Sequence, residues 1–150
     1  MKYLKPTERK KLIRELTNLY NISELPKTII KINKEQLNAF SGNLNKELLT
    51  QLTKTTRVES IGLPIIEKTN NQTKLTFDAL NILKPEKPIL EINEEQYNQW
   101  IRGHDIDIET NKGTIILKYE EDLVGIAKSS NGKIFNSVPK DRRVKDRIIK

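Results

Sequence analysis

The residues that could support chemistry are few, and they gather around the single histidine, His104, in the stretch RGHDID. Asp105 and Asp107 follow it, and one imidazole with two carboxylates could bind a metal ion. However, the two aspartates alternate along a predicted strand, so they share one face, which we expect to be wet. The chain has no cysteine, which excludes a thiolate zinc site and a thiol nucleophile. We therefore expect no catalytic residue, no metal and no cofactor, and we interpret His104 as a turn residue.

The glycines and the aromatic residues do not add a catalytic signature. The six glycines are isolated, and neither GxGxxG nor GxxxxGK is present, so no phosphate-binding loop is predicted. Tyr97 and Trp100 could stack on nucleic-acid bases. Their helical spacing beside Ile101 favours a place in the core instead. The sequence thus indicates a protein that is not an enzyme.

Basic residues are concentrated at the two ends of the chain. The net charge is +7, residues 1–14 hold six basic and one acidic side chain, and residues 133–150 hold seven basic and two acidic ones. Near the C-terminus they crowd into the stretch NSVPKDRRVKDR. These ends suit a polyanionic partner if the fold brings them onto one face, since phosphate contacts supply most non-specific affinity for nucleic acids. The alternative is a pair of solvated tails.

The first half of the chain alternates helical and strand-like patterns. Hydrophobic periodicity and turn residues predict a first helix that begins at Thr7 and ends before Asn21, followed by strands at 27–33 and in EQLNAFSGN. A second helix is predicted at 45–55 and a third strand at 58–66. A short helix in FDALNIL, capped by Thr76, closes this half. Apolar residues of the two longer helices are expected to face inward, and these are Leu12, Ile13, Leu16, Leu19, Tyr20, Leu48, Leu49 and Leu52. Gly62 and Pro64 predict a bulge or an edge position in the third strand.

The segment KPEKP, residues 84–88, is the best candidate for a linker, because its prolines disfavour helix and central strand. After it come a strand in PILEIN, a helix that begins at a capping box of Asn93 and Gln96 and stops at Gly103, and then short strands separated by tight turns. This order predicts an α+β protein in which a small N-terminal α/β domain (residues 1–84) precedes a small closed or nearly closed β-barrel (residues 85–150).

The second half also resembles a known family. The ordered set WIRG, DI, GTIILKY, LVGIA, NGKIFN and VPKDRR resembles a PUA domain, and in particular the PUA domain at the C-terminus of Sun-family RNA cytosine-5 methyltransferases. The stretches IIKINKEQLNAFSG and VESIGLPIIEKTNNQTKLTFDALNILKP are similar to the leading domain of PUA-containing ribosome-biogenesis proteins. The methyltransferase body and its catalytic cysteines are missing from this sequence. The resemblance therefore implies a free-standing archaeal relative that binds RNA without modifying it.

The resemblance also implies where RNA would bind. In PUA domains RNA lies along the helix after the first strand, the loop that follows this helix and a late strand. Carried onto this sequence, the strip comprises Arg102, Gly103, His104, Lys133, Lys140, Arg142, Arg143 and Lys145. At Gly103 the missing side chain would let backbone N–H groups approach a phosphate. Four cations near the N-terminus either extend this surface or form a solubilising helix face, and they are Arg9, Lys10, Lys11 and Arg14.

The expected function is non-catalytic binding of structured RNA, a precursor of rRNA or a tRNA, in ribosome biogenesis or RNA maturation in the cytoplasm. Residues 86–122 carry ten acidic and four basic side chains, so RNA would have to use a restricted strip. The same acidic stretch leaves a second interpretation open. In it the barrel is a protein-interaction module that docks a ribosomal protein or an RNA-modifying enzyme.

Overall fold

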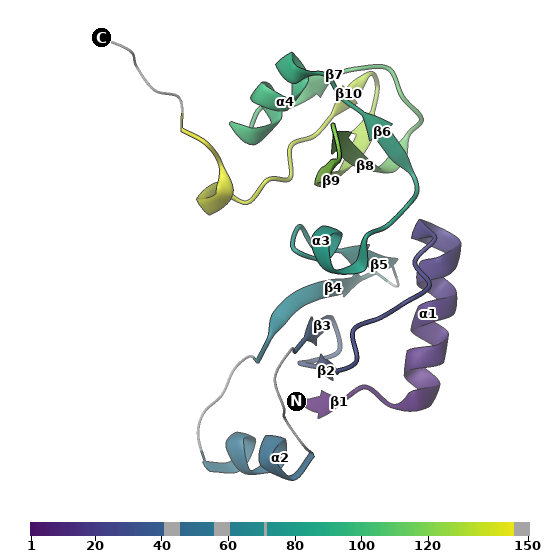
Figure 1. The fold of residues 1–150 in the computed structure, drawn as a ribbon, viewed down its shortest axis with the longest axis vertical. Coiled ribbons are helices and arrows are strands. Elements are labelled where there is room, and N and C mark those ends of the chain that lie inside the picture. The colour runs from purple at the N-terminus through teal and green to yellow at the C-terminus, as the bar shows by residue number, and fades with distance from the viewer. Residues whose placement is uncertain (41–45, 56–60, 71, 146–150) are drawn as a thin grey trace. The chain divides into compact units, whose positions relative to one another are not determined.

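The computed structural model describes residues 1–40, 46–55, 61–70 and 72–145. The chain falls into two compact units, Met1–Pro85 and Glu86–Lys150, which meet in the proline-containing segment KPEKP (Figure 1). Each unit holds one five-stranded sheet and its own helices, so the protein is mixed α and β. None of the described helices is both long enough and apolar enough to cross a membrane.

Unit 1 is built on an antiparallel sheet with the strand order β1-β2-β3-β4-β5. Its elements are β1 (Lys2–Tyr3), α1 (Pro6–Tyr20), β2 (Ile29–Lys31), β3 (Gln36–Ala39), α2 (Lys46–Thr55), β4 (Leu63–Thr69), β5 (Gln72–Leu75) and α3 (Ala79–Leu83). The predicted hairpin of β2 and β3 and the predicted irregularity at Pro64 are confirmed, because the β3–β4 register shifts there. The turn predicted at 41–43 and the start of the strand predicted from Val58 lie outside the described residues.

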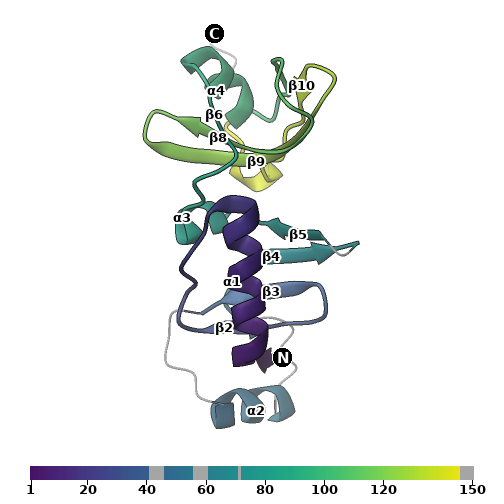
Figure 2. The same cartoon turned by 90° about the vertical axis from the view of Figure 1, so that its right-hand side faces the viewer.

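Helix α1 lies across the sheet of unit 1 (Figure 2). It begins at Pro6 rather than at a Thr7 cap, because proline fits the first helical position and the Glu8 carboxylate accepts the Lys5 N–H at 3.3 Å. The buried residues of α1 are Leu12, Leu16 and Tyr20, spaced four apart. This stripe is narrower than predicted, since Leu19 is 46% exposed.

The short helices of unit 1 follow the same local rules. In α2, Leu49 is buried as predicted, whereas Leu48 is 41% exposed and was wrongly placed inward; the side chain of Leu52 lies outside the described residues. The Thr76 hydroxyl oxygen accepts the Ala79 N–H at 3.2 Å, but α3 begins at Ala79 rather than at Phe77, and its N-cap residue is Asp78, which makes no side-chain cap hydrogen bond. At α3 a local side-chain hydrogen bond therefore accompanies the start of the helix.

Unit 2 is a curled sheet with the strand order β6-β8-β9-β10-β7, in which only β6 and β8 are parallel. Its elements are β6 (Ile89–Glu91), α4 (Glu94–Ile101), β7 (Ile106–Asp107), β8 (Gly113–Tyr119), β9 (Asp122–Ser130), β10 (Lys133–Ile134) and the 3₁₀ helix η1 (Lys140–Arg142). Full closure of the predicted barrel is not observed, because no described ladder joins β6 to β7. Strands of three and two residues offer too few hydrogen bonds to close a barrel between them.

Trp100 is the centre of the core of unit 2. It is fully buried, its indole Nε1–H donates to the Val124 carbonyl at 2.8 Å, and its ring lies directly against Gly125, where a side chain would collide with it. The prediction that Trp100 is a core residue is therefore confirmed. Tyr97 stacks on Tyr119 with the ring centroids 4.2 Å apart, so one face of its ring is already occupied.

Candidate nucleic-acid interface

The C-terminal end of α4 is fixed by a tight cap. Gly103 has a φ of +90°, its N–H donates to the Trp100 carbonyl at 3.0 Å, and the His104 N–H donates to the Gln99 carbonyl at 3.0 Å. This pair of bonds is a Schellman motif, which satisfies carbonyls at the helix end. The helix stop predicted at Gly103 is confirmed. The expectation that backbone N–H groups meet a phosphate here was wrong for these two amides, because the cap already uses both.

The C-terminal segment returns to this helix end and is hydrogen-bonded to it. The Val144 N–H donates to the Ile101 carbonyl at 2.8 Å. The side-chain amide of Asn136 donates to the carbonyls of Trp100 and His104, each at 2.8 Å. Its backbone N–H also donates to the Asp105 carboxylate at 2.7 Å. Residues about 35 positions apart in the sequence are thereby held in one surface region.

Arg143 lies directly over Gly103. A Cβ atom at position 103 would be 2.7 Å from the Cδ and Nε atoms of Arg143, which is well inside van der Waals contact. The Arg143 Nε–H donates to the Val138 carbonyl at 3.0 Å, and its side chain is half-buried. The lack of a side chain at Gly103 therefore makes room for an arginine of the same chain, which packs the C-terminal segment onto α4.

Three of the predicted cations surround this contact on the C-terminal side. Lys140 and Arg142 belong to η1, Lys145 follows Arg143, and all three are exposed. On the helix side Arg102 is exposed, and its guanidinium donates to the Asn98 carbonyl at 3.0 Å. The structure thus joins the segment 140–145 to the end of α4 as one surface, which we call the C-terminal ledge: Arg102, Gly103, Lys140, Arg142, Arg143 and Lys145.

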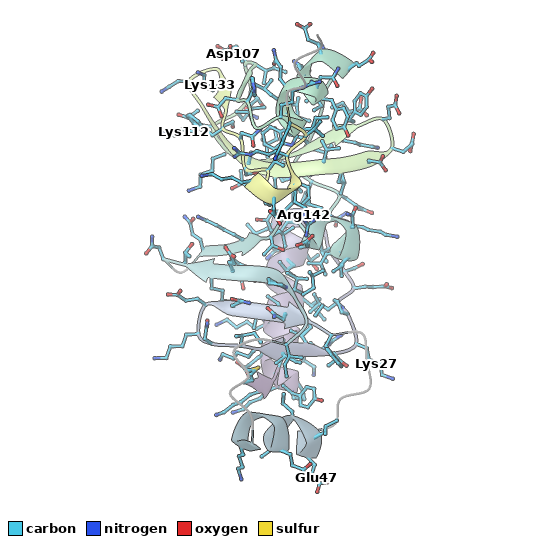
Figure 3. All side chains as sticks on the ribbon, turned by 90° about the vertical axis from the view of Figure 1, so that its left-hand side faces the viewer. Lys27, Glu47, Asp107, Lys112, Lys133 and Arg142 are labelled. Carbon is cyan, nitrogen blue, oxygen red and sulfur yellow. The ribbon has the colours of Figure 1, made fainter. Side chains whose placement is uncertain are left out.

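Two predicted site residues lie to the sides of the ledge. Lys133 is on β10 opposite Asp107, with its ammonium 3.9 Å from the carboxylate. Figure 3 shows Lys133 beside Lys112 and Asp107, well separated from Arg142. His104 is exposed and lines a shallow cavity of about 380 Å³ together with Arg102 and two carboxylates, Glu94 and Glu95. Lys133 and His104 therefore lie outside the C-terminal ledge and do not add to its positive charge.

No described residues form a group of three or more histidine and carboxylate side chains that could hold a metal ion. Asp105 and Asp107 are both exposed, as their alternation predicts. Among the described residues of this unit, Tyr119 has a shifted pKa. Burial raises the pKa of its hydroxyl, and the nearby carboxylates of Glu120 and Glu94 raise it further.

Phe135 was missed by the reasoning from sequence. It is 46% exposed and directly follows β10, two residues after Lys133, with the fully buried Ile134 between them. Alternation of exposed and buried side chains places Phe135 and Lys133 on the same outer face. An exposed aromatic ring beside a lysine is a surface on which a nucleic-acid base can stack. The sequence K-I-F, in which an aromatic residue follows a lysine by two positions, could have indicated this surface.

The four N-terminal cations divide into different roles. The guanidinium of Arg9 donates to the carbonyls of Leu25 and Pro26 at 3.2 and 2.8 Å, so it supports the loop before β2. Lys10 is exposed and lines none of the described cavities, whereas Lys11 and Arg14 both line a larger cavity of unit 1. Only part of the predicted basic extension therefore forms a common surface.

Comparison with known proteins gives a consistent assignment for unit 2. Residues 87–144 match the family model described as the methyltransferase RsmF PUA domain. The chain is 32% identical over 97 residues to a ribosomal RNA small subunit methyltransferase F of Shewanella oneidensis, an alignment that covers 62% of this chain and 20% of that protein. It is 27% identical over 96 residues to the protein of the same name from Shewanella woodyi, which covers 62% of this chain and 20% of the relative.

A third relative of the same name, from Vibrio campbellii, is 27% identical over 94 residues, with 57% of this chain and 20% of the relative covered. The chain thus spans about a fifth of the length of the curated relatives it matches. The matched region 87–144 includes α4, the curled sheet and the ledge except for Lys145. This protein therefore contains a PUA domain of the RsmF type and is related to the Sun-family methyltransferases.

Proposed function

We propose that this protein binds structured ribosomal RNA through the C-terminal ledge and that it does so without catalysing a reaction. The observation that carries the proposal is the return of the segment 140–145 onto the end of α4, through the Val144–Ile101 hydrogen bond and the packing of Arg143 on Gly103. The name of the relatives, ribosomal RNA small subunit methyltransferase F, supports rRNA as the class of ligand.

The chemistry of the ledge suits a folded RNA. Exposed lysine and arginine side chains at 140, 142 and 145 can contact several phosphates at once, and each contact releases counterions. Arginine can also pair with a phosphate through two N–H groups or stack on a base. Such a surface recognises shape and backbone, with bases read only where they are unpaired.

Several finer aspects belong to the same proposal. We propose a role in ribosome biogenesis or rRNA maturation, with tRNA as the other structured RNA to be tried. We also propose a cytoplasmic location, in keeping with a chain that has no cysteine. The archaeal origin suggested by the sequence remains a prediction.

The proposal is tested by titrating the full chain with an in-vitro transcript of small-subunit rRNA over a range of salt concentrations. The variant Lys140→Ala/Arg142→Ala removes two exposed cations of the ledge and leaves the Arg143 contact in place. We expect weaker binding and a slope of log K against log salt that is smaller by about 1.4–1.8, at roughly 0.7–0.9 per phosphate contact. Lys10→Gln/Lys27→Gln, with the same change in charge, is the matched control and should leave the slope unchanged. Equal slopes for the two double variants would contradict the assignment of the ledge.

A protein-interaction module is the second candidate, and one observation favours it. Glu94 and Glu95 line the cavity beside Arg102, so this face of α4 could receive a basic peptide. In that case the full chain should bind the rRNA transcript no better than a scrambled lysine-rich peptide of equal charge does. It should instead bind a basic peptide in a manner that Glu94→Gln/Glu95→Gln abolishes.

A further inference from the structure

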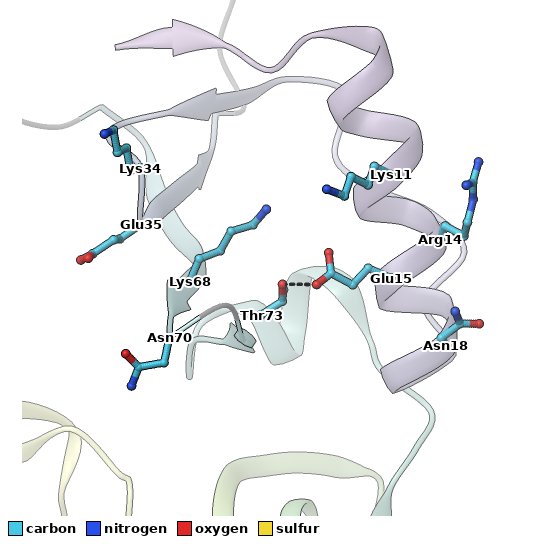
Figure 4. A pocket seen from close by; sticks show the side chains of 9 residues that line it. All are labelled: Lys11, Arg14, Glu15, Asn18, Lys34, Glu35, Lys68, Asn70 and Thr73. Carbon is cyan, nitrogen blue, oxygen red and sulfur yellow. Dashed lines mark hydrogen bonds between the residues drawn. The ribbon is translucent and has the colours of Figure 1, made fainter.

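A second positively charged surface lies entirely within unit 1. Helix α1, the β2–β3 turn and the β4–β5 hairpin enclose a groove of about 840 Å³. Figure 4 shows the side chains that line it, among them Lys11, Arg14 and Glu15 from α1, Lys34 from the β2–β3 turn, and Lys68 and Thr73 from β4 and β5. We call it the unit-1 groove.

Lysines converge on this groove from separate elements. In Figure 4 the side chains of Lys11 and Lys68 extend toward one another across the groove, one from the helix and one from β4. Lys34 lies at the β2–β3 turn. The same three lysines also line an adjoining cavity of about 160 Å³, so they stand where the two cavities meet.

These lysines are not neutralised within the described part of the chain. No ion pair or side-chain hydrogen bond joins Lys11, Lys34 or Lys68 to another described residue. Holding ammonium groups together without counterions is unfavourable by Coulomb repulsion, and an anion between them removes that cost. The arrangement is therefore one that a bound anion would stabilise.

The nearby carboxylates are already engaged or directed elsewhere. Glu15 Oε1 accepts the Thr73 hydroxyl at 2.6 Å, and Glu8 Oε2 lies 3.2 Å from the Lys31 ammonium outside the larger groove. Glu35 extends away from Lys11 in Figure 4. The described lining carries four cations, Lys11, Arg14, Lys34 and Lys68, against the two carboxylates of Glu15 and Glu35, so the groove has a net positive charge.

We propose that the unit-1 groove binds the phosphodiester backbone of an RNA strand, with Lys11, Lys34 and Lys68 as its phosphate contacts. This inference rests on the proposed RNA-binding function and adds a contact region in the other unit. The groove is too large and open for one isolated phosphate. Lysines act as point charges without the fixed geometry of a bidentate arginine. Such a groove follows a charged backbone without reading its sequence.

The test compares four full-length proteins: the unaltered chain, Lys11→Gln/Lys68→Gln in the groove, Lys10→Gln/Lys27→Gln as the control, and Lys140→Ala/Arg142→Ala in the ledge. Lys10 lies on the same helix as Lys11, and neither Lys10 nor Lys27 lines the groove. The probes are the fluorescently labelled small-subunit rRNA transcript and an oligouridine of about 20 nucleotides, longer than a typical single-strand site. Thermal unfolding of each variant verifies that it folds.

We expect the groove variant to bind both probes several-fold more weakly and to lose about 1.4 from the salt slope with oligouridine, at roughly 0.7 for each of two phosphates. The control should match the unaltered chain. If the groove variant equals the control while the ledge variant loses affinity, the groove proposal is overturned and the proposed function stands. If the unaltered chain binds neither probe, both are overturned. Charge reversal by Lys68→Glu must weaken binding further, and unchanged binding by this variant would also refute the groove.

Discussion

Replacing Gly103 by alanine tests the contact that holds the C-terminal ledge together. The backbone has a φ of +90° at this position, and a left-handed conformation costs an L-residue about 1–2 kcal/mol. The new Cβ would also lie 2.7 Å from Cδ and Nε of Arg143. Arg143 must then move and lose its hydrogen bond to the Val138 carbonyl, which is worth about 0.5–1.5 kcal/mol. The expected loss in the free energy of unfolding is therefore about 1.5–3.5 kcal/mol.

Denaturant unfolding measures this loss directly, because Trp100 is the single tryptophan of the chain and is fully buried in the core of unit 2. A double-mutant cycle with Arg143→Ala separates the two contributions. In the Arg143→Ala background, Gly103→Ala should cost only the backbone part, about 1–2 kcal/mol. The coupling energy between the two positions is therefore expected to be about 1 kcal/mol. Strict additivity of the two substitutions would refute the packing of Arg143 on Gly103.

Two further predictions concern the stability of each unit. Asn136→Ala removes the side-chain hydrogen bonds to the carbonyls of Trp100 and His104. Unfolding monitored by Trp100 fluorescence should therefore show that the free energy of unfolding falls by about 1–3 kcal/mol. The control is Asn98→Ala, on the exposed face of α4, and an equal or smaller loss for Asn136→Ala would contradict the prediction. In unit 1 the hydrogen bond from Lys31 and the Lys5 N–H lower the pKa of Glu8 below its ordinary value of 4.5. A lowered folded-state pKa contributes stability that is present above the ordinary value and is lost as the pH falls through the lowered one. Because the pair is more than one third exposed, the contribution should stay under about 1 kcal/mol. The stability difference between the unaltered chain and Lys31→Ala should shrink from about pH 6 to about pH 3, and a constant difference over that range would argue against the pair.

Features that depend on local hydrogen bonding could be predicted from the sequence. The capping box of Asn93 and Gln96 is present in both directions, at 2.8 and 2.9 Å. The turn before β10 has positive φ at Asn131 and Gly132, as an Asn-Gly pair predicts for a tight hairpin. Each of these features needs only a few consecutive residues, so the chain encodes it within one turn of structure.

Features that depend on distant parts of the chain could not be predicted in the same way. The exposure of Leu19 is set by how α1 is rotated on its sheet, which apolar spacing alone does not determine. The incomplete closure of the unit 2 sheet follows from how few residues of β6 and β7 pair. The cover of Gly103 by Arg143 depends on a tertiary contact across 40 positions.

The spatial arrangement of the candidate site was predicted in part. Reasoning from the family resemblance expected the C-terminal segment to lie beside the end of α4, and Arg143 does lie against Gly103. It grouped Lys133 with the ledge, although Lys133 faces Asp107 on β10. It also took the N-terminal cations as one set, whereas only Lys11 and Arg14 line the unit-1 groove. Charge can be counted along a sequence, but the partner of each charge requires the fold.

The central claim is that RNA occupies the surface where the C-terminal segment meets α4. Amide chemical shifts of the isotope-labelled full chain, followed during titration with a fragment of the small-subunit rRNA transcript, test it most directly. The account predicts that the largest shifts fall on residues 101–104 and 140–145. RNA binding that leaves both segments unshifted, with the changes confined to other residues such as the 120–122 hairpin, would contradict it.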